Sequence, residues 1–397
     1  MEYARTLAAA TLANTVGLGL WLAGSAMFLT RGVGLSPAEV GLGLTIAGFA
    51  GLCATVPLGH LADRRDPRTL RIVVQVLQAA VAASYLLVRS FPAFLVVAIV
   101  DALLVAGSLT LRAALIAAVA GPADRVRVFA MLRAVANVGI SVGAALAALA
   151  LVADTRTGYA LLVAGNATTY LISAALLLRL PAQVPAPEAP RARRWEALRD
   201  RPFLAVTAAS AVMSLHEVVL RLVLPLWIAT QTQAPRVAIS AVLVVNTALT
   251  ILLAVRASRA VGSAVHAGQA MRRAGFLLAA AMLLYAATGG MSTGTAVVVL
   301  LLTTALYTIG DLLHATAAAG LSYELAAPHA IGQYQGVSQL MTGLARAAGP
   351  ALLTVAVLDG GLLGWAALAS VFALAGITVP LLTPQSAPRP DAVRHLP

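Results

Sequence analysis

The chain contains a succession of long apolar segments, each close in length to a membrane-spanning helix. A helix needs roughly 20 mainly apolar residues to cross a hydrocarbon core of about 30 Å. Only 11% of the 397 residues are charged, whereas a soluble domain usually has about a quarter charged residues. We therefore predict an all-α polytopic membrane protein with twelve transmembrane helices in two six-helix bundles. The apolar segments are residues 7–30, 36–58, 71–89, 92–118, 129–152, 157–180, 203–230, 237–256, 270–290, 294–320, 333–357 and 361–383.

A segment rich in proline and arginine separates the sixth apolar segment from the seventh. Proline cannot continue a helix, because it lacks an amide hydrogen. A shift of 206 residues places Gly143 on Gly349, and this weak repeat is expected of two similar halves that face each other. The predicted parts are an N-terminal bundle at 1–180, a cytoplasmic linker at 181–201, a C-terminal bundle at 202–384 and a cytoplasmic tail at 385–397.

The positions of the arginines predict the orientation in the membrane. All 27 basic residues are arginine. With a cytoplasmic N-terminus, 20 of them lie in or beside cytoplasmic segments, four lie outside and three lie within spans. Cytoplasmic loops carry the excess of basic residues in membrane proteins. We therefore expect both termini in the cytoplasm. Abundant Ala and Arg without Lys is typical of a GC-rich bacterial genome, so we expect a bacterial inner membrane.

The net charge of +12 does not indicate a nucleic-acid partner, because the basic residues lie in short loops between apolar segments and not on one soluble face. The only cysteine, Cys53, lies in an apolar segment, which excludes an intrachain disulfide and a Cys-based metal site. No phosphate loop, nucleophile elbow or dense metal-ligand cluster is present. We expect no cofactor, no metal and no enzyme activity. The expected partners of a monomeric protein are a small-molecule substrate, protons and the lipid bilayer.

The most specific motif lies between the second and third apolar segments, where residues 59–68 read GHLADRRDPR. It resembles the loop between helices 2 and 3 of the major facilitator superfamily, Gly-x-Leu-Ala-Asp-Arg-x-Gly-Arg. In that family the loop latches conformations and does not touch substrate. The resemblance therefore implies a conformational latch formed by Gly59, Asp63, Arg64 and Arg68, with Asp66 in place of the second glycine.

A glycine pattern in the fifth apolar segment resembles, in part, the helix-5 pattern of proton-coupled drug and metabolite exporters, the 12-helix drug:proton antiporter branch of that family. Gly139 and Gly143 match this pattern, whereas the Gly-Pro step occurs in the eleventh segment as Gly349 and Pro350. Small residues allow close helix packing. We therefore predict that these four residues pack helices together.

Charged residues inside the spans give evidence that does not depend on the resemblance. A charge in the middle of the bilayer costs roughly 2.5–3.5 kcal/mol on insertion scales, so it needs a partner or a function. In the facilitator fold, helices 1, 4, 7 and 10 line the central cavity. Seven of the eight intramembrane charges lie on these helices: Asp101, Arg112, His216, Glu217, Arg221, Asp311 and His314, with Arg346 on helix 11.

The acidic residues of this set are candidates for proton coupling, because desolvation makes a carboxylate a reversible proton carrier. Asp311 is our first choice, assisted by His314 on the same helix face, with Asp101 or Glu217 as alternates. The same residues could instead only adjust the charge of the cavity. Glu217 and Arg221 form an i,i+4 pair that could simply neutralise itself. Candidates for the substrate cavity are Arg112, His216, Arg221, Asn14, Trp21 and Asn246.

The resemblance implies efflux of an amphipathic drug or metabolite in exchange for protons, by rocking of two bundles about a central site. A first alternative is a proton-coupled or facilitative importer of a small solute. A second is a membrane-embedded enzyme or a transporter-like sensor. An enzyme would gather acid, base or metal groups at one interface, whereas the charges here are spread in depth along the spans.

Overall fold

Twelve helices in the described part of the chain are long and apolar enough to cross a membrane, which confirms the predicted fold class and number of spans. The computed structural model describes residues 2–153, 155–182, 195–258 and 263–383. Most of the predicted linker at 181–201 and the tail at 385–397 lie outside the described residues.

The first six spans are α1 (Glu2–Met27) with η1 (Phe28–Val33), α2 (Pro37–Leu52) with α3 (Thr55–Ala62), α4 (Pro67–Ser84) with η2 (Tyr85–Leu87), α5 (Phe91–Val119), α6 (Arg125–Ala153) after the turn η3 (Pro122–Asp124), and α7 (Arg156–Leu177). The other six are α8 (Arg201–Met213) with α9 (His216–Val218), η4 (Val219–Val223) and α10 (Leu224–Gln231), α11 (Val237–Ser258), α12 (Ala264–Ala287) with η5 (Thr288–Gly290), α13 (Thr293–Glu324), α14 (Ile331–Leu353) with η6 (Thr354–Asp359), and α15 (Gly361–Leu382).

Local sequence signals determine where several of these helices begin. Ser36 caps α2 in a reciprocal arrangement with Glu39, and Asp66 accepts a hydrogen bond from the amide of Arg68 at the start of α4. A proline follows each of these caps, where its missing amide hydrogen costs nothing. Short capped connections of this kind place consecutive spans antiparallel to one another.

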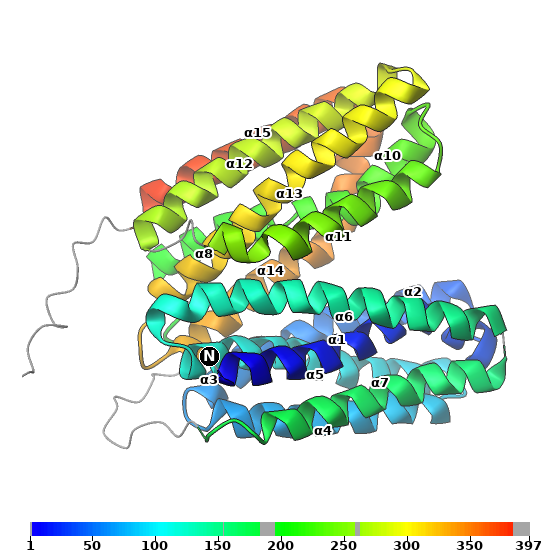
Figure 1. Ribbon diagram of the computed structural model, residues 1–397, viewed down its shortest axis with the longest axis vertical. Coiled ribbons are helices and arrows are strands. Elements are labelled where there is room, and N and C mark those ends of the chain that lie inside the picture. The colour runs from blue at the N-terminus through cyan, green and yellow to red at the C-terminus, as the bar shows by residue number, and fades with distance from the viewer. Residues whose placement is uncertain (1, 154, 183–194, 259–262, 384–397) are drawn as a thin grey trace, which may run out of the picture.

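The spans form two groups of packed helices (Figure 1). In the first group α1 packs on α6 and α7, α2 packs on α5, and α4 packs on α5 and α7. In the second group α12 packs on α13 and α15, and α11 packs on α13. A Cβ atom at Gly143 would collide with α1 at the carbonyl of Val16, whereas one at Gly349 would meet Val218 of the seventh span. The two residues paired by the 206-residue shift therefore occupy similar helix contacts.

The two groups meet chiefly where α14 crosses α3 and α5 and where α6 packs on α11. Figure 1 shows that they converge at the end where the N-terminus lies and diverge towards the opposite end. We call the end that contains the N-terminus, the α3–α4 connection and the start of α14 the latch end. This geometry determines which charged residues can interact between the groups.

Candidate functional site

An ion pair between Arg133 of α6 and Asp311 of α13 joins the two helix groups. Nη2 of Arg133 lies 2.8 Å from Oδ1 and 2.7 Å from Oδ2 of Asp311. The Asp311 side chain is only 6% exposed and that of Arg133 is 24% exposed. A buried carboxylate needs a cation and hydrogen bonds to offset the loss of hydration. Asp311 obtains both from the opposite helix group, so its charge contributes directly to how the groups are held together.

Two buried histidines continue this site inside the second group. His216 Nε2 lies 3.6 Å from Asp311 Oδ1 and 3.1 Å from Nδ1 of His314. On its other side, His216 Nδ1 lies 2.6 Å from the hydroxyl of Tyr307. His314 Nε2 lies 3.1 Å from the backbone carbonyl oxygen of Ser210. Asp311, His216 and His314 therefore form one connected polar cluster.

One arrangement of protons satisfies these contacts with both imidazole rings neutral. The carbonyl of Ser210 can only accept, so His314 Nε2 carries a hydrogen and its Nδ1 is an acceptor. His216 then donates from Nε2 to His314, and the single hydroxyl hydrogen of Tyr307 is shared between two acceptors, His216 Nδ1 at 2.6 Å and the His216 backbone carbonyl at 3.1 Å. The chain of hydrogen bonds consequently runs in one direction, from Tyr307 to Ser210.

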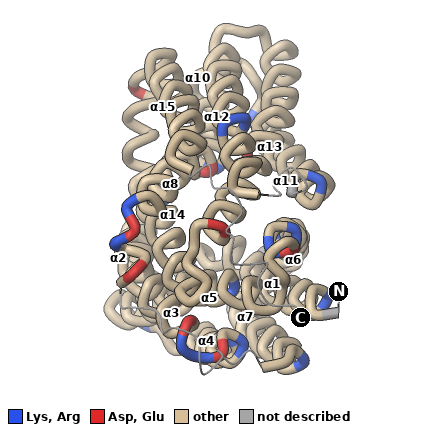
Figure 2. Tube along the Cα trace, turned by 90° about the vertical axis from the view of Figure 1, so that its left-hand side faces the viewer, with Lys and Arg blue, Asp and Glu red and all other residues tan. Residues whose placement is uncertain are grey.

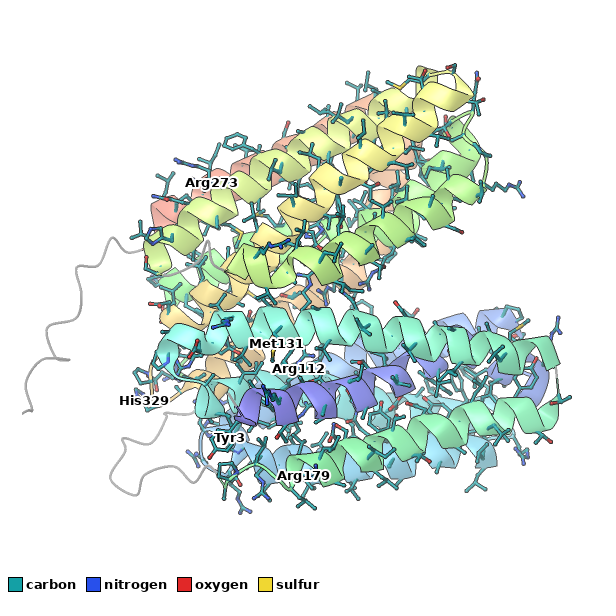
Figure 3. The ribbon with its side chains drawn as sticks, viewed as in Figure 1. Tyr3, Arg112, Met131, Arg179, Arg273 and His329 are labelled. Atoms are coloured by element: carbon teal, nitrogen blue, oxygen red, sulfur yellow. The ribbon has the colours of Figure 1, made fainter. Side chains whose placement is uncertain are left out.

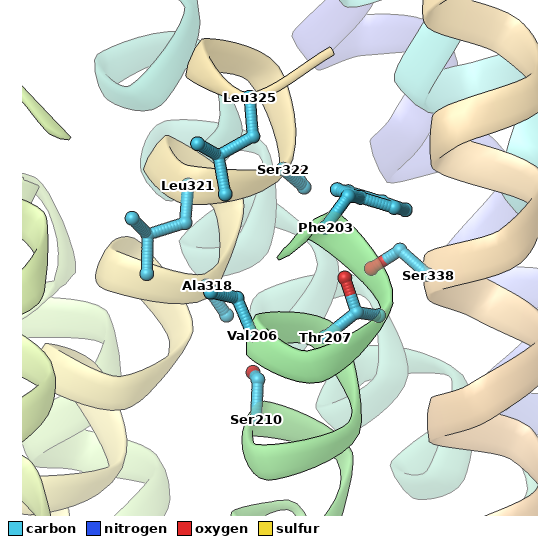
Figure 4. A pocket seen from close by; sticks show the side chains of 9 residues that line it. All are labelled: Phe203, Val206, Thr207, Ser210, Ala318, Leu321, Ser322, Leu325 and Ser338. Atoms are coloured by element: carbon cyan, nitrogen blue, oxygen red, sulfur yellow. The ribbon is translucent and has the colours of Figure 1, made fainter. Parts of the chain in front are cut away.

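A small pocket lies on the latch-end side of this cluster. The pocket is shown in Figure 4, and Ser210 both lines it and accepts the hydrogen bond from His314. Hydroxyl groups of Thr207, Ser322 and Ser338 also line it. The cluster therefore adjoins a partly polar space between α8, α13 and α14.

Glu217 has a different principal partner from the one its sequence spacing predicts. Its Oε1 accepts a hydrogen bond of 2.7 Å from Nη2 of Arg346 on α14. Arg221, the predicted i,i+4 partner, lies 3.9 Å from the other oxygen and is 76% exposed. The predicted i,i+4 ion pair is therefore present, but it is the longer of the two ion pairs of Glu217. The closer guanidinium group comes from another helix.

At the latch end, the carboxylate of Asp63 receives two hydrogen bonds from the first turn of α14. The donors are the backbone amides of Gly332 at 2.5 Å and Gln333 at 2.9 Å. Unpaired amides and the helix dipole make a helix N-terminus favourable for a carboxylate. Burial nevertheless raises the pKa of Asp63 to about 7, against the opposite effect of these two donors. Asp63 thus connects the first helix group to the second.

Glycines allow α3 and α14 to cross closely at this point. A Cβ atom on Gly59 would collide with the carbonyl oxygen of Gly332, and the reverse also holds. A Cβ atom on Gly336 would meet the carbonyl oxygen of Thr55 at 2.6 Å. The amides of α14 can reach Asp63 only because these positions lack side chains.

The other two residues of the loop motif do not contact the second helix group through a described hydrogen bond. Arg68 donates to the carbonyls of Leu177 at 3.1 Å and Leu178 at 2.7 Å, at the end of α7. Arg64 is exposed. Figure 2 shows the basic and acidic residues gathered around the start of α4. Arg68 therefore fastens the loop to its own group, while Asp63 reaches across.

Asp101 and Arg112, which lie on one face of α5, have separate partners. Asp101 accepts a hydrogen bond from Tyr85, whose ring packs 4.5 Å from that of Trp21. Arg112 is half-buried towards the latch end (Figure 3) and interacts electrostatically with Tyr323 of α13. Asp101 thus belongs to an aromatic cluster of the first group and not to the cluster around Asp311.

The remaining predicted cavity residues differ in exposure. His216 is fully buried, with its imidazole ring against the rings of Tyr307 and His314 on α13, and its place in the substrate cavity stays a prediction. Asn246 is half-buried and donates to Thr308 at 3.0 Å. Asn14 and Trp21 are half-buried on α1.

Sequence reasoning missed Arg133 and Arg71. Both were counted among the arginines that indicate a cytoplasmic loop, because they lie near the start of a span. Arg71 is in fact buried and donates to the hydroxyl of Ser108 on α5 at 3.0 Å. Arg133 lies eight residues after the start of α6, roughly 12 Å into the helix. The position of Arg133 well inside the span was the feature of the sequence that could have predicted a buried partner for it.

Among the described residues, no group of three or more His, Cys, Asp or Glu side chains is placed to hold a metal ion. The cluster around Asp311 and His216 combines an ion pair with a chain of hydrogen bonds. Its Arg133 contact lies between the two helix groups.

Comparisons with known proteins agree on the family. The family model described as Major Facilitator Superfamily matches residues 8–350. No curated protein matches the chain in sequence. Among solved structures, the human organic anion transporter MFSD10 has a TM-score of 0.69 at 18% identity, with 95% of this chain and 98% of that chain covered. A bacterial homologue of the iron transporter ferroportin, in an outward-facing state, has a TM-score of 0.76 at 14% identity, with 96% of this chain and 98% of that chain covered. The proton:xylose symporter XylE has 0.66 at 13%, covering 96% of each chain.

Proposed function

The chain belongs to the major facilitator superfamily, and from this membership we propose that it is a secondary active transporter that exports an amphipathic drug or metabolite in exchange for protons. In this proposal the two helix groups are the bundles at 1–180 and 202–384, and they rock about a central site. With the latch end in the cytoplasm, as the distribution of arginines predicts, the bundles are closed towards the cytoplasm and diverge outwards. The likeness to the ferroportin homologue in its outward-facing state agrees with this assignment.

The observation that carries the proposal is the ion pair between Arg133 and Asp311. An ionised Asp311 attracts Arg133 from the other bundle and favours closure of the cytoplasmic end. A protonated Asp311 has no charge with which to hold the guanidinium group, so the pair weakens and that end can open. When the bundles separate there, water reaches the carboxyl group and the proton can leave. Proton release and bundle closure are therefore coupled through one contact.

The latch adds a second contact at the same end. Asp63 holds the first turn of α14 through two hydrogen bonds, and it does so without reaching the charges around Asp311. Breaking both contacts is required for opening towards the cytoplasm. This division agrees with a role for Asp63 in setting the conformational equilibrium, and a role for Asp311 in linking that equilibrium to protons.

The test uses purified protein in liposomes with an imposed pH gradient and a pH-sensitive dye in the lumen. Amphipathic compounds of positive, neutral and negative charge are added in turn. We expect at least one compound to trigger proton movement in the wild type and in the Asp359→Asn control, which changes an exposed acid away from the site. Asp311→Asn is expected to abolish this movement. If Asp311→Asn retained it, Asp311 would not be the coupling residue.

A folded protein that moves no protons with any compound would overturn proton coupling. The importer or uniporter alternative would then be tested by measuring the direction of solute flux in the same liposomes.

A further inference from the structure

Two arginines with exposed guanidinium groups lie in the middle of the seventh and eleventh spans. Arg221 is 76% exposed and Arg346 is 45% exposed. Arg221 is ten residues from the end of α10, roughly 15 Å along the helix, and Arg346 is 15 residues from the start of α14. Neither position is at the membrane surface.

These guanidinium groups do not face lipid. An arginine near the centre of a lipid-facing helix is costly to insert into a bilayer, and such residues therefore face a bundle interior or a water-filled space. Arg346 and Arg221 both lie within 4 Å of Glu217, the former at 2.7 Å and the latter at 3.9 Å. Their shared neighbour places both on the same side of the second bundle. We therefore assign this side to the water-accessible space between the bundles.

The charges on this surface do not balance. Arg133 is matched by Asp311, and Arg346 by Glu217. The contact of Arg221 with Glu217 is too long for a hydrogen bond. Among the described charges of these contacts, three cations therefore face two carboxylates, and Arg221 has its donor groups available for an additional anion.

We propose that Arg221 and Arg346 bind the carboxylate of an amphipathic organic anion, and that Glu217 is an internal competitor for the same guanidinium groups. The proposal rests on the transport function proposed above and specifies its substrate class. The planar donor array of arginine matches a carboxylate and can form two parallel hydrogen bonds with it. A substrate carboxylate would bind Arg221 first and share Arg346 with Glu217.

The competitor role predicts opposite effects of two neighbouring substitutions. Removing the guanidinium group in Arg221→Gln should weaken anion binding at least tenfold. Removing the negative charge in Glu217→Gln releases Arg346 and should strengthen anion binding several-fold. A purely structural role for the cluster would make both variants bind more weakly. Arg236→Gln, which changes an exposed arginine in the connection before α11, is the matched control.

The probes are 2-naphthoate, 2-naphthamide and 2-(aminomethyl)naphthalene, which share one ring system and differ in charge. Binding to the purified full-length chain in lipid nanodiscs is measured by equilibrium dialysis at pH 7.5. We expect naphthoate to bind at least tenfold more tightly than the amide and the amine, in the wild type and in the Arg236 control. Equal binding of the three probes, tighter binding of the amine, or weaker naphthoate binding in Glu217→Gln would overturn the proposal.

This equilibrium measurement requires no proton gradient, so it is independent of coupling. Selective naphthoate binding, together with proton movement that persists in Asp311→Asn, would support the anion site and refute the proposed coupling residue. Proton movement triggered only by cationic compounds, without naphthoate binding, would support coupling and refute the anion site.

Discussion

Arg133→Gln tests whether the ion pair with Asp311 holds the bundles together at the latch end. The substitution removes the cation that the first bundle provides and leaves a nearly buried carboxylate behind. Removing one partner of a buried pair costs about 3–5 kcal/mol. Because Arg133 is partly exposed and His216 lies 3.6 Å from Asp311, we use the lower end of this range, about 3 kcal/mol, as the cost of the substitution. Because about 1.4 kcal/mol changes an equilibrium constant tenfold, this loss lowers the ratio of molecules with a closed latch end to those with an open one roughly 100-fold.

The change in this ratio can be measured as a distance between spin labels. Suitable label positions are Leu178, after α7, and Val265, in the first turn of α12, which are 60% and 46% exposed at the latch end of different bundles. The spin labels are attached to cysteines introduced at these two positions. Because Cys53 is the only native cysteine, Cys53→Ser leaves no other site for a label. We expect one short distance in the parent protein and mainly a longer distance in Arg133→Gln.

A double-mutant cycle separates the pair from other effects of the substitution. Asp311→Asn removes the attraction and leaves the charge of Arg133 without its partner, but Arg133 is 24% exposed and can stay hydrated, so the effect should be smaller than that of Arg133→Gln. The double variant should resemble Asp311→Asn, with a coupling energy of at least about 1.5 kcal/mol. An unchanged distance distribution in Arg133→Gln, or additive single effects, would refute the reasoning.

Three further predictions concern the latch and the buried cluster. Gly332→Ala should shift the same spin-label distance to the longer value, because its Cβ atom collides with a carbonyl of α3, whereas Gly41→Ala, with open space around it, should not. In an Asp311→Asn background, in which the proposed coupling residue cannot titrate, lowering the pH from 8 to 5 should stabilise the latched conformation, because the pKa of Asp63 is about 7 there and near 3.9 when solvated; this stabilisation is lost as the pH rises through about 7, and adding Asp63→Asn should remove it. Tyr307→Phe leaves His216 Nδ1 without its donor, so thermal unfolding in detergent should show a loss of about 1–3 kcal/mol.

The number and limits of the spans could be predicted from the sequence because membrane insertion depends on the composition of each segment. The predicted segment 92–118 corresponds to α5 at Phe91–Val119, and 361–383 corresponds to α15 at Gly361–Leu382. The segment predicted at 129–152 begins four residues late, because Arg125 and Arg127 made the first turn of α6 look like a loop.

The candidate site could be predicted only along single helices. Asp311 and His314 are three residues apart, so their common face follows from helix periodicity. Their partners Arg133, His216 and Ser210 come from α6 and the seventh span, and no local pattern connects them. For Glu217, the local rule selected Arg221, whereas the close contact is with Arg346, 129 residues away.

By itself, the sequence therefore determined a twelve-span membrane protein with a loop motif, intramembrane charges and an arginine distribution that predicts its orientation. Hydropathy, charge and helix periodicity are properties of short segments, and a bilayer acts on them one segment at a time. Only the tertiary structure decided that Asp63 meets the first turn of α14 and that Arg133 meets Asp311. These contacts depend on the rotation and crossing of helices, which are set by side-chain packing and by the glycines that let backbones approach.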